Sequence, residues 1–196
     1  MEVLFERGDA TFVFDKEFDI KYLSPVARYV QWKLENHRWD DYNEFFHAVR
    51  LIEDLKLDRD VWFDTHCLLR DNLVTGVLLI VGGDLKKLET KYEIKDKSLL
   101  LKYFHIVDKG NGNGSFWLKS VIIPHYKQRG YKHIYINSSH PDSFPFYKRF
   151  GSSVATYEQA SDNNRYRRQG RCFLINIDVD ASGSPPSEFR CTESKP

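Results

Sequence analysis

A glycine-rich loop in the second half of the chain has the residue types that bind phosphate groups. Residues 110–114 read GNGNG and follow the apolar run Ser98–Val107. Glycines let the backbone turn sharply and leave its N–H groups unobstructed, and at the start of a helix such groups form an anion site. The loop lacks the Gly-Lys-Ser/Thr of a P-loop, and Ser115 stands where a Rossmann fingerprint needs its third glycine. The pattern predicts a phosphate or diphosphate held by backbone amides.

The same glycines could instead form a hairpin turn, since Asn-Gly is the strongest short hairpin signal. A returning strand would alternate apolar and polar residues. Residues 116–126 instead group their apolar side chains, with Lys119-Ser120 and Pro124-His125 between the groups. This spacing is typical of a helix with one broad buried side. We therefore expect strand, glycine loop, helix and strand in that order, with Pro124 bending the helix or removing one of its hydrogen bonds.

The elements around the loop suit one mixed domain. Asp60–Arg70 and Leu73–Gly82 predict a β-hairpin with an Asp71-Asn72 turn. The almost wholly apolar Ser98–Val107 is typical of a central strand buried on both faces. We also expect strands at 10–14, 132–137, 154–157 and 171–177, and helices from Ser24-Pro25, over 42–55, after the loop, and over 143–150. The fold class is thus α/β (α+β), a mixed sheet of six to seven strands flanked by about four helices.

The order of these motifs resembles the GNAT superfamily of N-acetyltransferases. The family's acetyl-CoA loop is an Arg or Gln, two residues, Gly, one residue, then Gly or Ala; Lys109, Gly112 and Gly114 take those positions. Phe146–Gly151 resembles the family's second signature, a helix that carries a Tyr and closes in Gly. The resemblance spans Ala10 to Ile177. It implies a GNAT-like domain over residues 1–179, and the composition of residues 180–196 predicts a disordered tail.

The resemblance also implies the chemistry, which is the direct attack of a primary amine on the thioester of acetyl-CoA, the co-substrate. Tyr147 would protonate the departing thiolate, although an ordinary core aromatic is the alternative. Lys119, Lys127, Lys148 and Arg149 are candidates for the 3′-phosphate of CoA, although a solvated surface side chain is the alternative for each. The cofactor-binding residues implied are Phe104 and Ile106 on the strand, Lys109, Gly110, Asn111, Gly112, Asn113, Gly114 and Ser115 in the loop, and His140 and Lys148 beyond it.

The group that takes the proton from the amine is less evident. The family's bases lie early in the loop strand, where this chain has Ser98 and Leu100. Asp64 and His66 share one face of the hairpin at a spacing of two, and both could reach an active-site cleft. A histidine at its ordinary pKa could deprotonate an ammonium group. A structural role for each, or a water chain with no dedicated base, stays open.

Composition excludes several classes of protein. The chain has 196 residues, 41% of them hydrophobic and 15% aromatic, which is typical of a globular domain. No apolar run approaches the length of a membrane-spanning helix, so we expect no membrane partner. The three cysteines form no CxxC pair, which predicts reduced thiols, no metal site and a cytoplasmic location.

Charge is unevenly distributed. Residues 1–98 hold 15 basic and 20 acidic residues, and residues 99–196 hold 14 and 8. The basic second half suits the phosphates of CoA, and the acidic first half, especially Glu35–Glu53, indicates a cationic acceptor. A homodimer is compatible with the family, but no exposed stripe specifies an interface.

Two other functions remain open. The first is a non-catalytic GNAT-fold module that binds acyl-CoA or a partner, because the loop strand has no base. The second is a nucleic-acid-directed acyltransferase or binder, because basic residues alternate with Tyr166 in Asn163–Arg171. A solvated loop explains that run more simply, and the near-neutral net charge of +1 disfavours nucleic acid as a partner.

Overall fold

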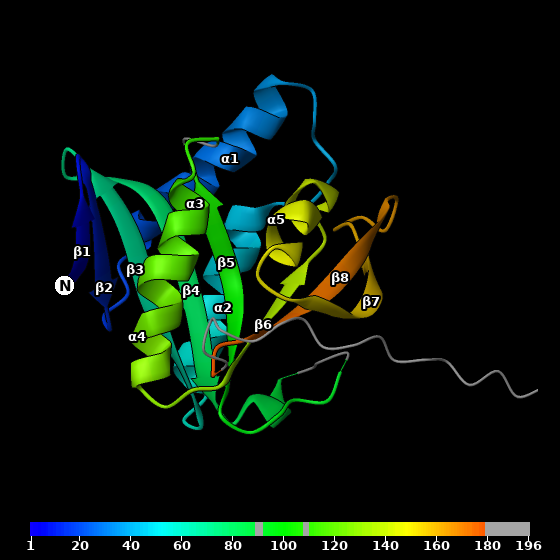
Figure 1. The fold of residues 1–196 in the computed structure, drawn as a ribbon. Helices are drawn as coiled ribbons and strands as arrows, with labels where there is room; N and C mark the ends of the chain where they lie inside the picture. Colours follow the sequence, from blue (N-terminus) through cyan, green and yellow to red (C-terminus); the bar gives the residue numbers. More distant parts are fainter. Residues whose placement is uncertain (89–91, 108–109, 179–196) are drawn as a thin grey trace, which may run out of the picture.

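The computed structural model describes residues 1–88, 92–107 and 110–178. Over these residues one eight-stranded sheet has the order β1-β2-β3-β4-β5-β6-β8-β7 (Figure 1). The expected tail at 180–196 and the loop residue Lys109 lie outside the described residues. The strands are β1 Glu2–Arg7, β2 Ala10–Asp15, β3 Val61–Arg70, β4 Leu73–Gly83, β5 Ser98–Ile106, β6 His133–Ser138, β7 Ser152–Ala160 and β8 Arg167–Asn176.

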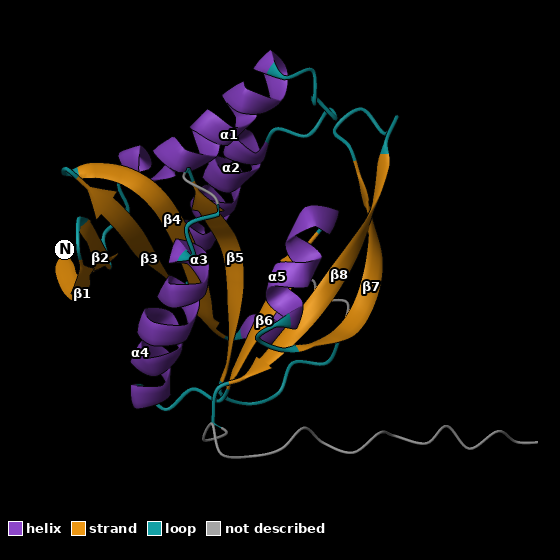
Figure 2. Ribbon diagram, turned by 45° about the horizontal axis from the view of Figure 1, so that its top comes forward, coloured by secondary structure: helices purple, strands orange, loops and turns teal. Residues whose placement is uncertain are grey.

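Helices cover both faces of the sheet (Figure 2). The helices are α1 Ser24–Glu35, α2 Glu44–Leu57, α3 Asn113–Phe116, α4 Ile123–Gln128 and α5 Phe144–Lys148. Side chains from α1 and α2 pack on one face of β2, β3 and β4. The other face is covered by the helical segment 113–128 and by α5, whose residues share one buried cluster with the central strands. None of the helices described here is long and apolar enough to cross a membrane.

Local signals account for several of these elements. Asp71 and Asn72 have φ of 49° and 61°, as both central residues of a type I′ turn must, and the expected hairpin is confirmed as β3–β4. The expected six to seven strands are fewer than the eight observed, because β1 was not anticipated. Its sequence EVLFER places apolar residues side by side without alternation, and it lies at the exposed edge of the sheet.

The helix after the glycine loop is continuous but not uniform. A π-helical segment, Trp117–Ile122, joins α3 to α4, and the N–H of Ile123 donates to the carbonyl of Leu118, five residues back. Pro124 follows directly; it has no N–H, and its ring would crowd a carbonyl in an ordinary α-helical turn. The disturbance expected at Pro124 is therefore present as a π-helical turn, wider than an α-helical one, just before the proline.

Strands β5 and β6 diverge along their length, and the candidate site lies where they separate. They pair in parallel only from Ser98–Leu101 to His133–Ile136. Beyond that point β5 stays paired with β4 as far as Ile106, while β6 stays paired with β8 as far as Ser138. A backbone edge of β5 and the end of β6 are therefore not paired with each other on the side of the glycine loop, and we call this divergence the opening between β5 and β6.

Candidate functional site

The glycine loop presents the start of a helix to this opening. Gly110 and Gly112 have φ of 95° and 71°, and a Cβ atom at either would meet nothing within 4 Å, so backbone conformation rather than space requires glycine. The first hydrogen bond of the helix runs from the N–H of Phe116 to the carbonyl of Gly112. The N–H groups of Asn113, Gly114 and Ser115 therefore have no acceptor within the helix, and they lie at its positive end. The expected strand–loop–helix order is confirmed, and the hairpin alternative is wrong.

Two elements, β5 and α5, converge on this helix start. A Cβ atom at Gly114 would lie 3.4 Å from Ile106, 3.5 Å from Phe146 and 3.6 Å from Phe104. Phe104 and Ile106 thus face the loop helix from β5, and Phe146 approaches from α5. The guanidinium of Arg149, just after α5, donates a 3.2 Å hydrogen bond to the Ser115 hydroxyl. Of the four cations expected near the 3′-phosphate, Arg149 is the one for which the described residues show a contact with the loop. Its neighbour Lys148 is exposed.

Tyr147 is buried on the sheet side of α5. Its ring contacts those of Phe146 and Phe173 at centroid distances of 5.2 and 5.6 Å. Burial raises the pKa of Tyr147 above its usual value, so the phenol keeps its proton at neutral pH. Its hydroxyl makes no hydrogen bond to the residues described here. Such a group can donate a proton to a ligand in the opening, and it can equally be a core aromatic.

The expectation that Asp64 and His66 reach a cleft is wrong. Their exposed fractions are 4% and 0%. The Tyr126 hydroxyl donates to Asp64 Oδ2 at 2.9 Å and lies 2.8 Å from His66 Nε2, and Arg129 also contacts Asp64. The two residues do share one strand face, but it is the face that α4 covers. Burial holds the pKa of His66 well below its usual value, so its neutral imidazole belongs to the core.

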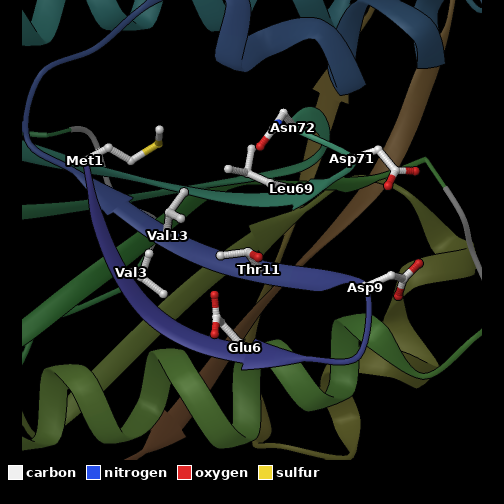
Figure 3. Close-up of a pocket in the computed structure, with 9 residues that line it drawn as sticks. All are labelled: Met1, Val3, Glu6, Asp9, Thr11, Val13, Leu69, Asp71 and Asn72. Atoms are coloured by element: carbon white, nitrogen blue, oxygen red, sulfur yellow. The ribbon is translucent and has the colours of Figure 1, made fainter.

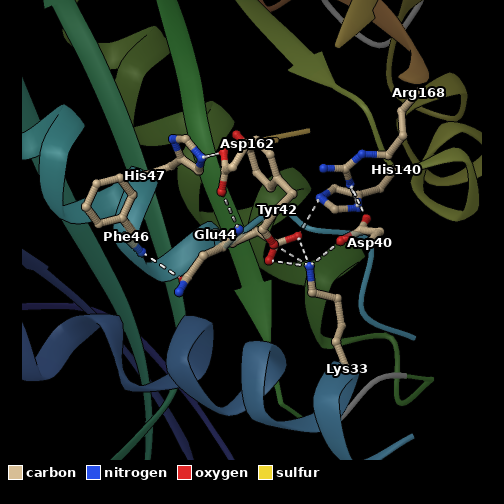
Figure 4. Close-up of polar contacts among 10 residues, drawn as sticks. Lys33, Asp40, Tyr42, Glu44, Phe46, His47, His140, Asp162 and Arg168 are labelled. Carbon is tan, nitrogen blue, oxygen red and sulfur yellow. Dashed lines mark hydrogen bonds and ion pairs between the residues drawn. The ribbon is translucent and has the colours of Figure 1, made fainter. Parts of the chain in front are cut away.

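A second polar cluster lies on the α1–α2 side of the sheet, where the end of α1 and the start of α2 meet the segment after β6 and the start of β8 (Figure 4). We call Lys33, Asp40, Glu44, His140 and Arg168 the Lys33 cluster. Lys33 is only 2% exposed. Its ammonium group donates to Asp40 Oδ1 at 2.8 Å, to the Tyr42 carbonyl at 2.6 Å and to Glu44 Oε1 at 2.8 Å. Arg168 pairs with Asp40 at 3.0 Å. Burial raises the pKa of Glu44 despite this lysine.

His140 connects the Lys33 cluster to the opening. It follows the end of β6, and its Nε2 lies 3.7 Å from Glu44 Oε1. Its Nδ1 lies 3.5 Å from Arg168 Nη1, and its ring meets the edge of Tyr29. The imidazole expected beside the cofactor therefore points toward α1 and α2.

Sequence reasoning missed the Lys33 cluster, although one signal for it exists. Lys33 is seven residues after Val26, so the two lie on the same face of α1, and both are buried. A lysine on a buried helix face requires partners. Nothing in the local pattern identifies those partners, because they come from four different segments.

Hydrogen bonds fasten the α1–α2 connection to the β7–β8 turn beside this cluster. The N–H groups of Asp162 and Asn163 donate to the carbonyl and the carboxylate of Asp41, and His47 Nε2 lies 2.6 Å from Asp162 Oδ1. In the basic run 163–171, Arg168 points inward to Asp40. The run is therefore not a free basic strip, which weakens the nucleic-acid alternative.

A separate groove of about 380 Å³ lies at the β1 edge of the sheet (Figure 3). It is lined by Met1, Val3, Glu6, Asp9, Thr11, Val13, Leu69, Asp71 and Asn72. None of the expected site residues is among them. The groove is therefore distinct from the opening between β5 and β6.

Comparison with known proteins bears on the fold. No family model and no curated sequence matches the chain. A solved Salmonella typhimurium acetyltransferase that modifies the N-terminal serine of ribosomal protein L7/L12 is similar, with TM-score 0.58 and 17% identity over 90% of this chain and 100% of its own. So is yncA of the same organism, a putative acetyltransferase solved with acetyl-CoA, with TM-score 0.55 and 13% identity over 89% and 98%.

A third similar structure is the Escherichia coli ribosomal-protein-S18-alanine N-acetyltransferase, with TM-score 0.54 and 9% identity over 89% of this chain and 99% of that one. All three likenesses run over nearly the whole of the solved chains. Identity this low shows the arrangement of elements and not the activity. Together with the diverging strands and the helix start between them, they show that this chain has the fold of the GNAT acetyltransferases.

Proposed function

We propose that the protein is an N-acetyltransferase that transfers the acetyl group of acetyl-CoA to a primary amine. One observation carries the proposal: the amides at Asn113–Ser115, which have no acceptor within their own helix, lie where β5 and β6 diverge, with the Tyr147 phenol on the adjoining helix. The amides suit a diphosphate, the opening suits an extended arm, and the phenol suits a leaving thiolate. The acetyltransferases of like fold support the assignment.

The residues divide the work along the opening. The amides from Gly110 to Ser115 would hold the diphosphate, with the Arg149 guanidinium beside them. The edge of β5 from Phe104 to Ile106 would pair with the pantetheine arm, because no β6 residue pairs with it there. Tyr147 would give its proton to the sulfur as the amine nitrogen attacks the carbonyl carbon. The chemistry needs no covalent enzyme intermediate.

The acceptor would approach from the side of α1 and α2. Helices α1 and α2 carry the acidic residues Glu35, Glu44, Glu53 and Asp54, and the Lys33 cluster lies between the two helices. We propose an amine that is cationic before it reacts. The alternative of a non-catalytic module predicts binding of CoA without transfer.

Calorimetric titration with acetyl-CoA tests the proposal. Gly112 and Gly130 both have positive φ, 71° and 83°, and both have open space around a Cβ atom, so valine strains either backbone in a similar way. Gly112→Val should weaken acetyl-CoA binding about ten-fold or more, because it displaces the amides, whereas Gly130→Val should bind like the wild type.

Release of thiol over a panel of amines then tests for turnover. The panel contains a serine-first and an alanine-first tetrapeptide, spermidine and kanamycin. Binding without thiol release would favour the non-catalytic module. Wild-type protein that binds no acetyl-CoA would end the proposal.

A further inference from the structure

We propose that the protein forms a two-fold dimer in which β1 pairs antiparallel with β1 of a second copy, with Glu2 of each copy opposite Arg7 of the other. The surface is the outer edge of the sheet, and its occupant is a second copy of this chain. A two-fold axis brings the same surface of both copies together, so that surface must be complementary to itself. The inference goes beyond the proposed function and does not depend on it.

Strand β1 forms one end of the sheet, and its described pairing is with β2 on the inner side (Figure 1). An unpaired strand edge offers a row of backbone N–H and C=O groups to another chain. Two apolar side chains of β1 remain exposed, Val3 at 57% and Phe5 at 41%. The strand contains neither proline nor lysine, two residues with which proteins block such edges. The strand at the other end of the sheet, β7, is mostly polar by contrast.

The two charged ends of β1 lie on the same face of the sheet. Directly paired residues of antiparallel strands point to the same face. Glu2 pairs with Phe14, whose ring contacts that of His125 in α4 at a centroid distance of 5.3 Å. The Arg7 guanidinium lies 4.5 Å from the ring centroid of Phe116 in α3. Glu2 and Arg7 are therefore both on the face that α3 and α4 cover.

A β-bulge in the middle of β1 produces this arrangement. Residues 2 and 7 of a regular strand would point to opposite faces, because side chains alternate along it. The register with β2 shifts between Val3 and Phe5, so Leu4 is an extra residue and restores Glu2 and Arg7 to one face. When Leu4 lies opposite Phe5 of the second copy, the two bulges meet, and the register continues on both sides of them.

One register matches both the charges and the faces. With the bulges opposite each other, Glu2 faces Arg7 of the second copy, and the two-fold axis repeats this contact. A slip of one residue in one direction would bring Glu2 opposite Glu6, which carries the same charge and lines the groove on the other face. A slip in the other direction would bring Val3, also in that groove, opposite Arg7. Charge and facing therefore specify the pairing.

The pairing leaves the candidate functional site of each copy accessible. Three strands separate β1 from β5, so the opening between β5 and β6 lies away from the dimer contact. The groove of about 380 Å³ beside β1 would instead be bordered by Val3 and Glu6 of both copies. The dimer thus accounts for a groove that contains none of the expected site residues.

Sedimentation velocity of the full chain tests the inference at concentrations from about 1 to about 200 μM. The wild type should pass from monomer to dimer in this range. Glu2→Arg and Arg7→Glu should each weaken dimerisation about ten-fold or more, because two contacts between unlike charges become two contacts between like charges. Glu6→Arg is the matched control on the same strand but the other face, and it should dimerise within about two-fold of the wild type.

An equimolar mixture of Glu2→Arg and Arg7→Glu then tests the register. In the mixed dimer each arginine again faces a glutamate, so the mixture should dimerise like the wild type although neither variant does so alone. Circular dichroism checks that each variant is folded. A mixture that stays monomeric, or a loss in Glu6→Arg equal to that in Glu2→Arg, would overturn the pairing.

Hydrogen exchange of the wild type gives a measurement that needs no variant. Peptides that cover β1 should exchange more slowly in the dimer than in the monomer, because the outer N–H groups become hydrogen-bonded, whereas peptides that cover β7 should not change. Wild-type protein that remains monomeric at about 200 μM, or a dimer that protects β7 and not β1, would overturn the inference and leave the proposed function standing.

Discussion

Replacement of Lys33 by methionine removes the one ammonium group that contacts Glu44 in the described chain. Both residues are 2% exposed, and Met fills nearly the same space as the lysine stem. Asp40 keeps Arg168 as a partner, so in the variant Glu44 is the one carboxylate of this pair that loses its lysine without another cation replacing it. Breaking a buried ion pair from one side destabilises proteins by about 3–5 kcal/mol.

In Lys33→Met, the Glu44 carboxyl group limits this cost by taking up a proton. Its ordinary pKa is 4.5, and one unit corresponds to about 1.4 kcal/mol, so protonation on folding costs about 3.4 kcal/mol at pH 7 and about 0.7 kcal/mol at pH 5. The folded state then holds a proton that the unfolded state has released. Stability of Lys33→Met relative to wild type therefore falls as pH rises above 4.5.

Urea denaturation at pH 5 and pH 7 measures both values. A loss of about 3 kcal/mol at pH 7 corresponds to a fall in Tm of about 6–12 °C for a chain of this length. Adding Glu44→Gln to Lys33→Met should remove the pH dependence and recover most of the loss at pH 7. A loss that is equal at the two pH values, or a double variant as unstable as Lys33→Met, would refute the reasoning.

Three further results are expected. Tyr147→Phe should lower kcat about 100-fold without weakening acetyl-CoA binding, by kinetics and calorimetry, since the ring stays and only the proton donor is lost; unchanged kcat would assign Tyr147 to the core alone. The pKa of His66 in the folded protein lies well below its unfolded value, so the unfolded state alone gains this proton as pH falls below 6.5. The free energy of unfolding should therefore fall by about 1.4 kcal/mol per pH unit from this residue, and His66→Gln should remove that slope from values measured in urea. An unchanged slope would contradict the burial argument. Burial raises the pKa of Cys67 to about 12 and of Cys172 to about 11, so iodoacetamide at pH 8 should label their peptides only in urea, as mass spectrometry would show; labelling of the native protein would contradict it.

The sequence determined the elements whose signals are local. The Asp71-Asn72 pair prefers the left-handed region, so it specifies the β3–β4 turn by itself. The grouped apolar residues after Gly114 likewise distinguish a helix from a returning strand. These preferences act within a few residues of chain, and they were sufficient to indicate the fold class and the candidate phosphate loop.

Only the tertiary structure decided which groups meet. Period two places Asp64 and His66 on one strand face, but whether that face meets an opening or a helix depends on where α4 packs. Lys33, Glu44 and His140 show no shared pattern, because α1, α2 and the end of β6 are brought together by the packing of the sheet between its two helical layers. Backbone preference is a property of neighbours in sequence, whereas burial and pairing of charges are set by contacts between distant segments.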